Sequence, residues 1–424
     1  MNSQGKKSVQ QNMIYNTVGS LIYYACQWLM SILIVRISGY EDAGVLSIAM
    51  SVTAAPAIVG LFNIRSFQAS DLKGQYMDYI YIQSRVYTNI LSFIICIIMV
   101  FVGGYSIEKS VVILTFMLFK IAEGFADVYY GIEQKKERMD YVGISLTIRG
   151  IGTIVLFTMV IFCTQNLFLG VLAISLFSFL VIFFYDRRIV KSWNKKECGE
   201  DSKSLKNREV FQLMKVCLPL AIVAFLNNLS LNIPKIYLEG YFGSEVMGVY
   251  SSVASPTLVV QLAATTIFAP LIPVLTKQFQ NRNKDEFFSI IKRFGVLVAG
   301  LSVVCLIGSK LLAHWGLVLL FTESIEPYVY LFVPIIIVSI LIAINASLFS
   351  ICTLIREIKL QYIIGLCGVL VAWLLSITVV KQLSMIGVVY ALAGTLCVQI
   401  IIQIIIILRK VKNYKWGTQD ESKG

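Results

Sequence analysis

The chain has 424 residues, of which 57% are hydrophobic and only 14% are charged, with a formal net charge of +12. Soluble domains carry roughly 25% charged residues, so this composition excludes an ordinary soluble protein. Excess lysine and arginine is typical of the cytoplasmic loops of membrane proteins, and here it does not indicate nucleic-acid binding.

Apolar stretches of membrane-spanning length recur along the whole sequence. A span needs about 20 apolar residues. The pattern predicts twelve helices with the approximate ranges 13–37, 43–63, 84–104, 110–132, 141–163, 167–186, 212–238, 247–275, 294–319, 328–354, 360–380 and 384–408. The first stretch is too long for the apolar part of a cleavable signal peptide, so we expect none. The predicted fold is an all-α integral membrane protein.

The distribution of lysine and arginine predicts the orientation of these helices. Twenty-eight of the 36 basic residues fall in the termini and in the even-numbered connections, whereas the opposite side has only Arg36, Lys109 and Lys381. Because positive residues stay in the cytoplasm, both termini are expected to be cytoplasmic.

A polar, mixed-charge segment after the sixth predicted helix has the composition of a flexible linker. We expect a first lobe over residues 1–190, a cytoplasmic linker over 191–210, and a second lobe with a cytoplasmic tail over 211–424.

The two halves resemble each other around the link between their first and second helices. A shift of 204 residues places Gly39 on Gly243 and Ser51 on Ser255, along with four further identical pairs. Both copies run in the same direction through the membrane, which predicts a parallel repeat about an axis along the membrane normal. Transporters use such repeats, with the substrate near mid-membrane between the halves.

Polar side chains recur at helical spacing in the first, seventh and eighth predicted spans. Pro219 and Pro234 interrupt the seventh. We expect these polar stripes to line a hydrated cleft for substrate, although hydrogen bonding between packed helices is an alternative. The candidate substrate-binding residues are Asn16, Tyr23, Gln27, Asn228, Asn232, Lys235, Ser251, Ser255 and Gln261.

Four charged residues lie inside two neighbouring predicted spans. Lys120, Glu123 and Asp127 share one face of the fourth span, and Arg149 lies inside the fifth. Unpaired charges in a bilayer are costly, so we predict an ion-pair network in which Arg149 faces Glu123 or Asp127. The network is either a structural clamp or a site that couples transport to a proton or cation.

Two arginines, Arg65 and Arg85, flank the second cytoplasmic segment. Guanidinium groups suit bidentate recognition of phosphate, although ordinary positive-inside anchoring explains each residue equally well. His314 is the only histidine, and the nine cysteines show no metal-binding spacing, so we expect no metal and no cofactor. The sequence also lacks nucleotide-binding and hydrolase signatures, which argues against an enzyme.

Several stretches carry a resemblance to a known family through their order and spacing. They are ILIVRISGYEDAGVLSIAMSV after Asn16, NIRSFQASD at the end of the second span, GIEQKKERMDYVGISLTIRG around the fifth, and LNIPKIYLEGYFGSEVMGVYSSVASP through the seventh and eighth. Together they resemble the Wzx-type polysaccharide flippases of the multidrug/oligosaccharidyl-lipid/polysaccharide exporter superfamily.

The resemblance implies two six-helix lobes in a V, in a bacterial cytoplasmic membrane. The implied substrate is an undecaprenyl-diphosphate-linked oligosaccharide, flipped to the outer leaflet by alternating access with H⁺ or Na⁺ as the coupling ion. Membrane lipids, a polysaccharide polymerase and assembly proteins are the implied partners. By this analogy Arg36, Arg65, Lys235 and Arg149 become candidates for phosphate attraction or coupling.

Other functions remain open on the sequence alone. A cation-coupled multidrug antiporter of the same superfamily would need an acidic central cavity, and the polar spans offer only Glu239. Flippases for the peptidoglycan precursor tend to have two further helices. A membrane polymerase of O-antigen type would be an enzyme, and such enzymes usually carry a large outer loop that this sequence lacks. A channel or a structural role would explain neither the repeat nor the linker.

Overall fold

The computed structural model describes residues 9–71, 75–193, 203–258 and 271–414. Throughout these residues the regular secondary structure is helical, with no β-strand. The chain divides into two compact units, Met1–Asn232 (unit 1) and Ile233–Gly424 (unit 2). The lobe boundaries at the 191–210 linker stay a prediction, and part of that linker lies outside the described residues.

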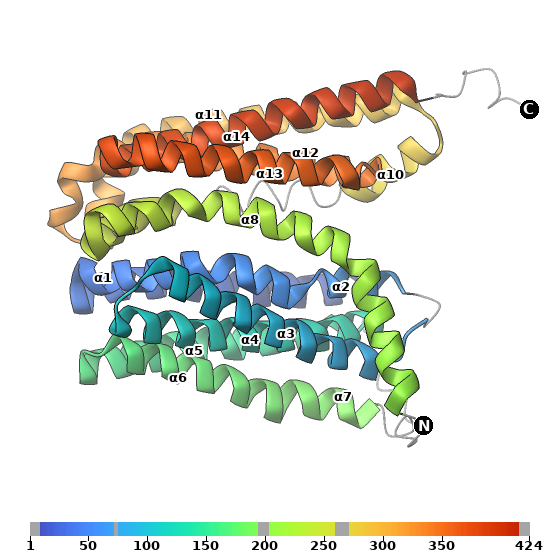
Figure 1. Cartoon of the computed structure of the whole chain (residues 1–424), viewed down its shortest axis with the longest axis horizontal. Coiled ribbons are helices and arrows are strands. Elements are labelled where there is room, and N and C mark those ends of the chain that lie inside the picture. Colours follow the sequence, from blue (N-terminus) through green and yellow to red (C-terminus); the bar gives the residue numbers. More distant parts are fainter. Residues whose placement is uncertain (1–8, 72–74, 194–202, 259–270, 415–424) are drawn as a thin grey trace, which may run out of the picture. The chain divides into compact units, whose positions relative to one another are not determined.

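Unit 1 is a bundle in which α1 packs against α3, α4 and α5, while α4 and α5 both pack against α6 (Figure 1). Its elements are α1 (Val9–Leu61), α2 (Ile64–Ser70), α3 (Asp78–Gly103), α4 (Ile107–Lys135), α5 (Met139–Thr164), α6 (Leu167–Val181), the π-helical turn η1 (Ile182–Asp186), α7 (Arg187–Trp193) and the first part of α8 (Lys203–Ala254).

Unit 2 is built around α14, which packs against α12 and α13, and α11 packs in turn against α12 (Figure 1). After the end of α8 its elements are η2 (Ser255–Thr257), α10 (Leu271–Gln280), α11 (Lys284–Leu320), η3 (Glu323–Leu331), α12 (Phe332–Leu354), α13 (Ile358–Leu375), the π-helical turn η4 (Ser376–Val380) and α14 (Lys381–Asn413).

Two glycines interrupt the longest helices at equivalent places. As straight rods, α1 and α8 would each measure about 80 Å, far more than the hydrocarbon core of about 30 Å. Gly39 breaks α1 with φ 89° and ψ −175°, and Gly243 breaks α8 with φ 86° and ψ 175°. A side chain at either position would be strained, because only glycine adopts this backbone conformation readily. The breaks are separated by the shift of the predicted repeat, so the two copies share a backbone geometry as well as residues.

Eight helices in the described part are long and apolar enough to cross a membrane. Three of these candidates contain a non-helical residue, at Gly39, Gly243 or Ser384. Gln10–Gln68 and Lys359–Asn413 each cover two predicted spans, whereas Asn207–Thr257 covers one and the first part of the next. The charged helix α4 is not among the eight. The chain is therefore a multi-pass membrane protein, while the number twelve stays a prediction.

Large apolar side chains on the surface agree with a lipid environment. Phe101 is 86% exposed, Trp315 78% and Leu319 75%. Water would penalise such exposure, whereas lipid tails do not.

Small residues bring α1 and α5 into direct backbone contact. A Cβ atom on Gly143 of α5 would overlap the backbone of Tyr15, and one on Gly19 of α1 would overlap the backbone of Gly143. Small residues allow this approach between membrane helices. The contact fixes Tyr23 of α1 against Gly150 of α5, next to the charged residues described below.

Candidate substrate and ion site

One face of α4 carries an ion pair that the sequence spacing predicted. The Nζ atom of Lys120 lies 2.6 Å from Oε2 of Glu123, and both side chains are about one-quarter exposed. The other carboxylate oxygen of Glu123 accepts a hydrogen bond from the Tyr23 hydroxyl. The Lys120 ammonium also lies 5.5 Å from the ring centres of Phe116 and Phe119, where cation–π attraction adds to the pair.

Asp127, which lies about one helical turn after Glu123 on α4, is bound by two arginines. Its Oδ2 atom accepts a bond of 2.8 Å from Nη2 of Arg85, and its Oδ1 atom lies 3.3 Å from Nη1 of Arg65. Arg85 is fully buried and also donates to the Gly60 carbonyl oxygen at 2.6 Å. Arg65 is about one-third exposed, and its Nε and Nη2 groups both donate to Oε1 of Gln134, at 3.3 Å each.

Arg149 of α5 is 2% exposed and forms no direct ion pair with Glu123 or Asp127 among the described residues, although it interacts electrostatically with Glu123. Its guanidinium lies 5.5 Å from the centre of the Tyr23 ring, and its Nη1 donates to the Tyr130 hydroxyl at 3.4 Å. Tyr23 thus contacts Arg149 with its ring and Glu123 with its hydroxyl, which links the two charges through one aromatic side chain.

These side chains form one group, the α4 cluster, made of Tyr23, Arg65, Arg85, Lys120, Glu123, Asp127 and Arg149. In it four cations face two carboxylates, so the cluster has a surplus of positive charge. Arg85 and Arg149 are buried, whereas the other four charged side chains are between 20% and 32% exposed. The cluster can therefore attract an anion at its partly exposed side.

Three predicted residues lie on α8 at helical spacing. Asn232 is buried, and its amide nitrogen donates to the Asn228 carbonyl oxygen at 2.9 Å and to Oδ1 of Asn228 at 3.1 Å. Lys235 is half-buried, and no ion pair to it is found in the described part of the chain. A half-buried ammonium without a counter-charge is a candidate for binding an anion.

The other predicted substrate residues in the described part of the chain lie on α1 in unit 1, or at the end of α8 and in η2 in unit 2. Asn16 and Gln27 are half-buried on α1, and Arg36 is exposed near the Gly39 break. Ser251 and Ser255 donate to carbonyl oxygens of their own helix, at 3.0 and 3.2 Å, which is the usual satisfaction of a serine in a membrane helix. Gln261 lies outside the described residues.

Two buried carboxyl groups escaped the sequence reasoning. Glu133, near the end of α4, and Asp186, in the π turn η1, are fully buried, and we call them the carboxyl pair. In the sequence both residues lie at the ends of predicted spans, next to cytoplasmic loops, where acidic residues are common. One sequence signal points to a buried Asp186, because this residue directly follows the apolar run FLVIFFY at residues 179–185.

The loop before α3 is held by Asp71. Its carboxylate accepts bonds from the Gln75 and Tyr76 backbone N–H groups and from the Tyr81 hydroxyl, at 2.8, 3.2 and 2.9 Å. Lys135 lies 3.4 Å away. Burial by itself raises the pKa of Asp71, but these donors and the lysine outweigh it and hold the pKa below its usual value.

In unit 2 a buried amide network joins α12 to α14. Asn345 donates to Gln399 at 3.2 Å and accepts from Gln403 at 3.1 Å. Interhelical amide bonds of this kind fix helix packing in a membrane.

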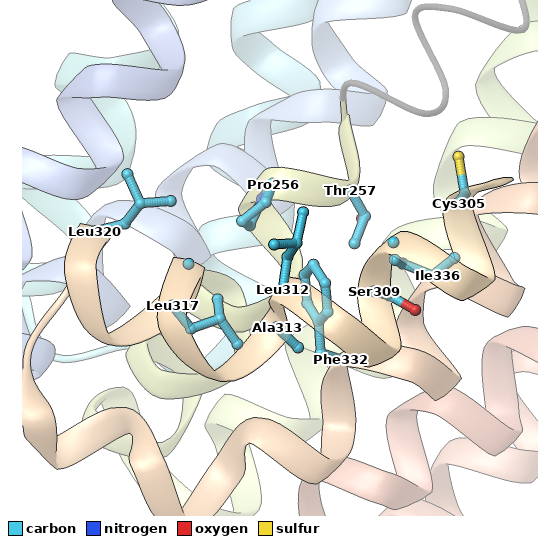
Figure 2. A pocket seen from close by; sticks show the side chains of 12 residues that line it. Pro256, Thr257, Cys305, Ser309, Leu312, Ala313, Leu317, Leu320, Phe332 and Ile336 are labelled. Carbon is cyan, nitrogen blue, oxygen red and sulfur yellow. The ribbon is translucent and has the colours of Figure 1, made fainter.

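Unit 2 also holds an apolar cavity of about 300 Å³ beside η2, α11 and α12 (Figure 2). Among the described residues, its lining includes Pro256, Leu312, Phe332 and Ile336 and no charged side chain. The hydroxyl groups on its wall are occupied, since Thr257 accepts from Ser339 at 2.8 Å and Ser309 donates to the Leu306 carbonyl oxygen at 2.8 Å. The cavity does not suit a charged or sugar-bearing ligand.

The fold is similar to that of solved MATE-family transporters. An inward-facing multidrug-resistance transporter of the MATE family superposes with a TM-score of 0.70 at 14% identity, covering 95% of this chain and all of that one. The eukaryotic MATE transporter AtDTX14 gives 0.64 at 15% identity, with 95% and 97% covered. A superfamily transporter from Pyrococcus furiosus gives 0.58 at 15% identity, with 96% and 97% covered.

Sequence comparison gives a narrower assignment. Residues 9–279 match the model of the family described as polysaccharide biosynthesis protein, and the chain belongs to that family. The capsular polysaccharide biosynthesis protein CapF of Staphylococcus aureus is 29% identical over 300 residues, which are 69% of this chain and 73% of that protein.

Proposed function

We propose that the protein is a flippase, which moves a polyprenyl-diphosphate-linked oligosaccharide from the inner to the outer leaflet of the bacterial cytoplasmic membrane. The observation that carries the proposal is the surplus positive charge of the partly exposed α4 cluster. A diphosphate is an anion that Arg65 can bind through two donors, because its guanidinium presents a planar fork.

The family supports the substrate class, since its description and the name of CapF both refer to polysaccharide biosynthesis. The exporter fold supports transport by alternating access. The large hydrophilic head would cross on polar side chains while the prenyl tail stays in lipid. In this proposal Arg65 and Lys235 attract the diphosphate, and Gln27, Asn228 and Asn232 contact sugar hydroxyl groups.

The sign of the net charge of the α4 cluster distinguishes the proposed function from the main alternative, a drug–cation antiporter. A drug–cation antiporter needs carboxylates that stay free to attract a cationic drug. Both carboxylates of the α4 cluster are already bound by lysine or arginine, and the cations outnumber them. The geometry therefore favours an anionic substrate.

The wider setting is also part of the proposal. In this proposal transport is coupled to H⁺ or Na⁺, as the family resemblance implies. Both termini lie in the cytoplasm, and the product is handed to a polysaccharide polymerase and assembly proteins. A reporter fused to the C-terminus that fluoresces only in the cytoplasm tests the orientation.

The function is tested in a strain from which the gene is deleted. Intact protoplasts are treated with an impermeant sugar-binding probe, and the lipid-linked oligosaccharide that it reaches on the outer leaflet is measured. We expect deletion to abolish the outer pool and to enlarge the inner one. The wild-type gene is expected to restore the outer pool, Arg65→Lys to restore it in part, and Arg65→Ala to leave it about tenfold lower, the loss of one charge-assisted contact.

The matched control is Lys292→Ala, which removes an exposed positive charge from α11 and is expected to restore the pool fully. An undiminished outer pool in a deletion strain with no second flippase gene would refute the proposed function.

A further inference from the structure

The carboxyl pair differs from every carboxylate of the α4 cluster in its lack of partners. Glu133 and Asp186 are each 0% exposed, and apart from the Ser145 hydroxyl, which approaches Asp186, their four carboxylate oxygens have no hydrogen-bonding partner in the described part of the protein. By contrast, Glu123 and Asp127 are partly exposed and fully paired. Buried polar groups in native proteins are nearly always satisfied, so this pair calls for a ligand.

The surroundings of the pair contain both charges and tyrosines. The helix α4, which carries Glu133, packs against the turn η1, which carries Asp186, and the two carboxyl groups repel each other electrostatically. Glu133 is faced by five titratable or charged groups, which are Asp186, Asp140, Tyr185, Arg65 and Arg138. Asp186 is faced by Glu133, Arg149, Tyr129, Tyr130 and Tyr185, and the Ser145 hydroxyl lies nearby.

The cations near Glu133 are already engaged elsewhere. Arg138 binds both oxygens of Asp140, at 2.9 and 3.0 Å. Arg65 binds Asp127 and Gln134. Arg149, which faces Asp186, still has its Nε and Nη2 groups buried without a partner in the described chain. One cation is therefore available to the pair, and it can balance only one carboxylate.

We propose that Glu133 and Asp186, together with Arg149, form a proton-binding site in unit 1 that takes up and releases one proton. The proton comes from bulk water, and the only bond formed is an O–H bond on a carboxylate oxygen. With the proton bound, one neutral carboxyl, one carboxylate and the Arg149 guanidinium give zero net charge. Two ionised carboxylates within one buried region that holds a single available cation would be costly, which is why the first proton binds. A metal cation fits less well, because Arg149 already supplies a positive charge there.

The site is connected to the candidate head-group ligand. Arg65 faces Glu133 electrostatically and lies with its guanidinium 5.8 Å from the centre of the Tyr130 ring. Tyr130 in turn bonds Arg149 at 3.4 Å and exchanges a hydrogen bond of 2.9 Å with Ser145. An ionised Glu133 adds a second negative charge near Arg65, besides that of Asp127, and weakens its attraction for a diphosphate, whereas a protonated Glu133 removes that charge. By linkage, proton binding and anion binding then favour each other. This coupling, unlike the proton site itself, rests on the proposed function.

The proton site is tested by infrared difference spectroscopy on the full chain in liposomes, as the pH is stepped from acid to alkaline. We expect a carbonyl-stretch band of a buried protonated carboxyl that disappears reversibly. The band is expected to be lost or moved in Glu133→Gln and in Asp186→Asn. It is expected to persist in Glu357→Gln, a control in which the altered carboxylate is paired with Lys410 at 2.5 Å in unit 2. Absence of any such band in the wild-type protein would overturn the proposal, and so would a band that shifts when choline chloride is replaced by sodium chloride.

The coupling is tested with undecaprenyl diphosphate as the probe. In the wild-type protein we expect its dissociation constant to rise about tenfold per pH unit above the midpoint of the infrared transition, as for linkage to one proton. Glu133→Gln mimics the protonated carboxyl and is expected to keep tight binding without pH dependence. If the band is present but the probe does not bind at any pH, the proton site stands and the proposed function fails. If the probe binds without pH dependence in the wild-type protein, the coupling fails.

Discussion

The Arg85–Asp127 pair offers the sharpest test of the α4 cluster. Arg85 is fully buried, and Asp127 is its only carboxylate partner among the described residues, at 2.8 Å. Asp127→Asn keeps the shape of the side chain but removes its charge, which leaves the buried guanidinium uncompensated. Breaking a buried ion pair in this way costs about 3–5 kcal/mol. Because Asp127 is 20% exposed, we expect the lower end of that range.

A loss of about 3 kcal/mol corresponds to a melting temperature lower by roughly 6–12 °C in a protein unit of this size. The shift in melting temperature is measured by heating samples of the purified protein in detergent and then quantifying, by size-exclusion chromatography, the protein that stays folded. Arg65→Ala removes the second, longer contact to Asp127 from a side chain that is about one-third exposed. It is expected to cost less than about 1 kcal/mol.

A double variant separates charge from packing. Replacing both partners by apolar residues, Arg85→Met with Asp127→Leu, is expected to recover much of the stability that Asp127→Asn alone loses, because no unpaired charge remains. The reasoning is refuted if Asp127→Asn melts with the wild-type protein, or if Arg65→Ala proves as harmful as Asp127→Asn.

Three further predictions concern the backbone breaks, the Asp71 loop and Lys235. Gly39→Ala and Gly243→Ala each force a Cβ into a glycine-only conformation and are expected to cost about 1–3 kcal/mol, whereas Gly300→Ala, in open space within α11, is expected to raise the melting temperature slightly. Because the fold lowers the pKa of Asp71, its contribution to stability is present above the unfolded value of about 3.9 and is lost as the pH falls through the folded value. Asp71→Asn is therefore expected to lower the melting temperature at pH 7 and to have little effect at the acid end; an equal effect at both ends would contradict this. Lys235→Ala is expected to reduce flipping about tenfold at unchanged melting temperature, since no ion pair is lost, while Lys235→Arg retains flipping; a large drop in melting temperature would show a structural role instead.

The helical framework could be predicted from the sequence because its causes are local. Apolar length and the positive-inside rule depend on residues close together in the chain. The Lys120–Glu123 pair was predictable for the same reason, since residues three apart share a helix face. The alignment of Gly39 with Gly243 was visible as a repeat, although its geometry, two matching breaks, was not.

The partners of the remaining charges depend on tertiary packing, which the sequence does not display. Arg65 and Arg85 stand near a predicted loop, where anchoring is the ordinary expectation, yet both bind Asp127. Arg149 was expected to pair with Glu123 or Asp127, but its direct contacts are Tyr23 and Tyr130, because the close contact of α1 with α5 places the Tyr23 ring beside it. The carboxylates of Glu123 and Asp186 act on it only electrostatically. Asp186 was placed at the edge of a loop, and the π turn buries it.

That π turn has a consequence for how the chain tolerates changes in length. A π-helical turn holds one residue more than the α-helical turn that would otherwise occupy its place, and such turns often occur at functional positions. Deleting one of residues 182–185 would let η1 relax into the α-helices on either side with little disturbance to the packing of α6 and α7. The same deletion a few residues earlier would rotate everything beyond it by about 100° around the helix axis. Single-residue gaps between family members in this region are therefore expected to fall inside η1, and members with such a gap are expected to hold the acid that corresponds to Asp186 differently.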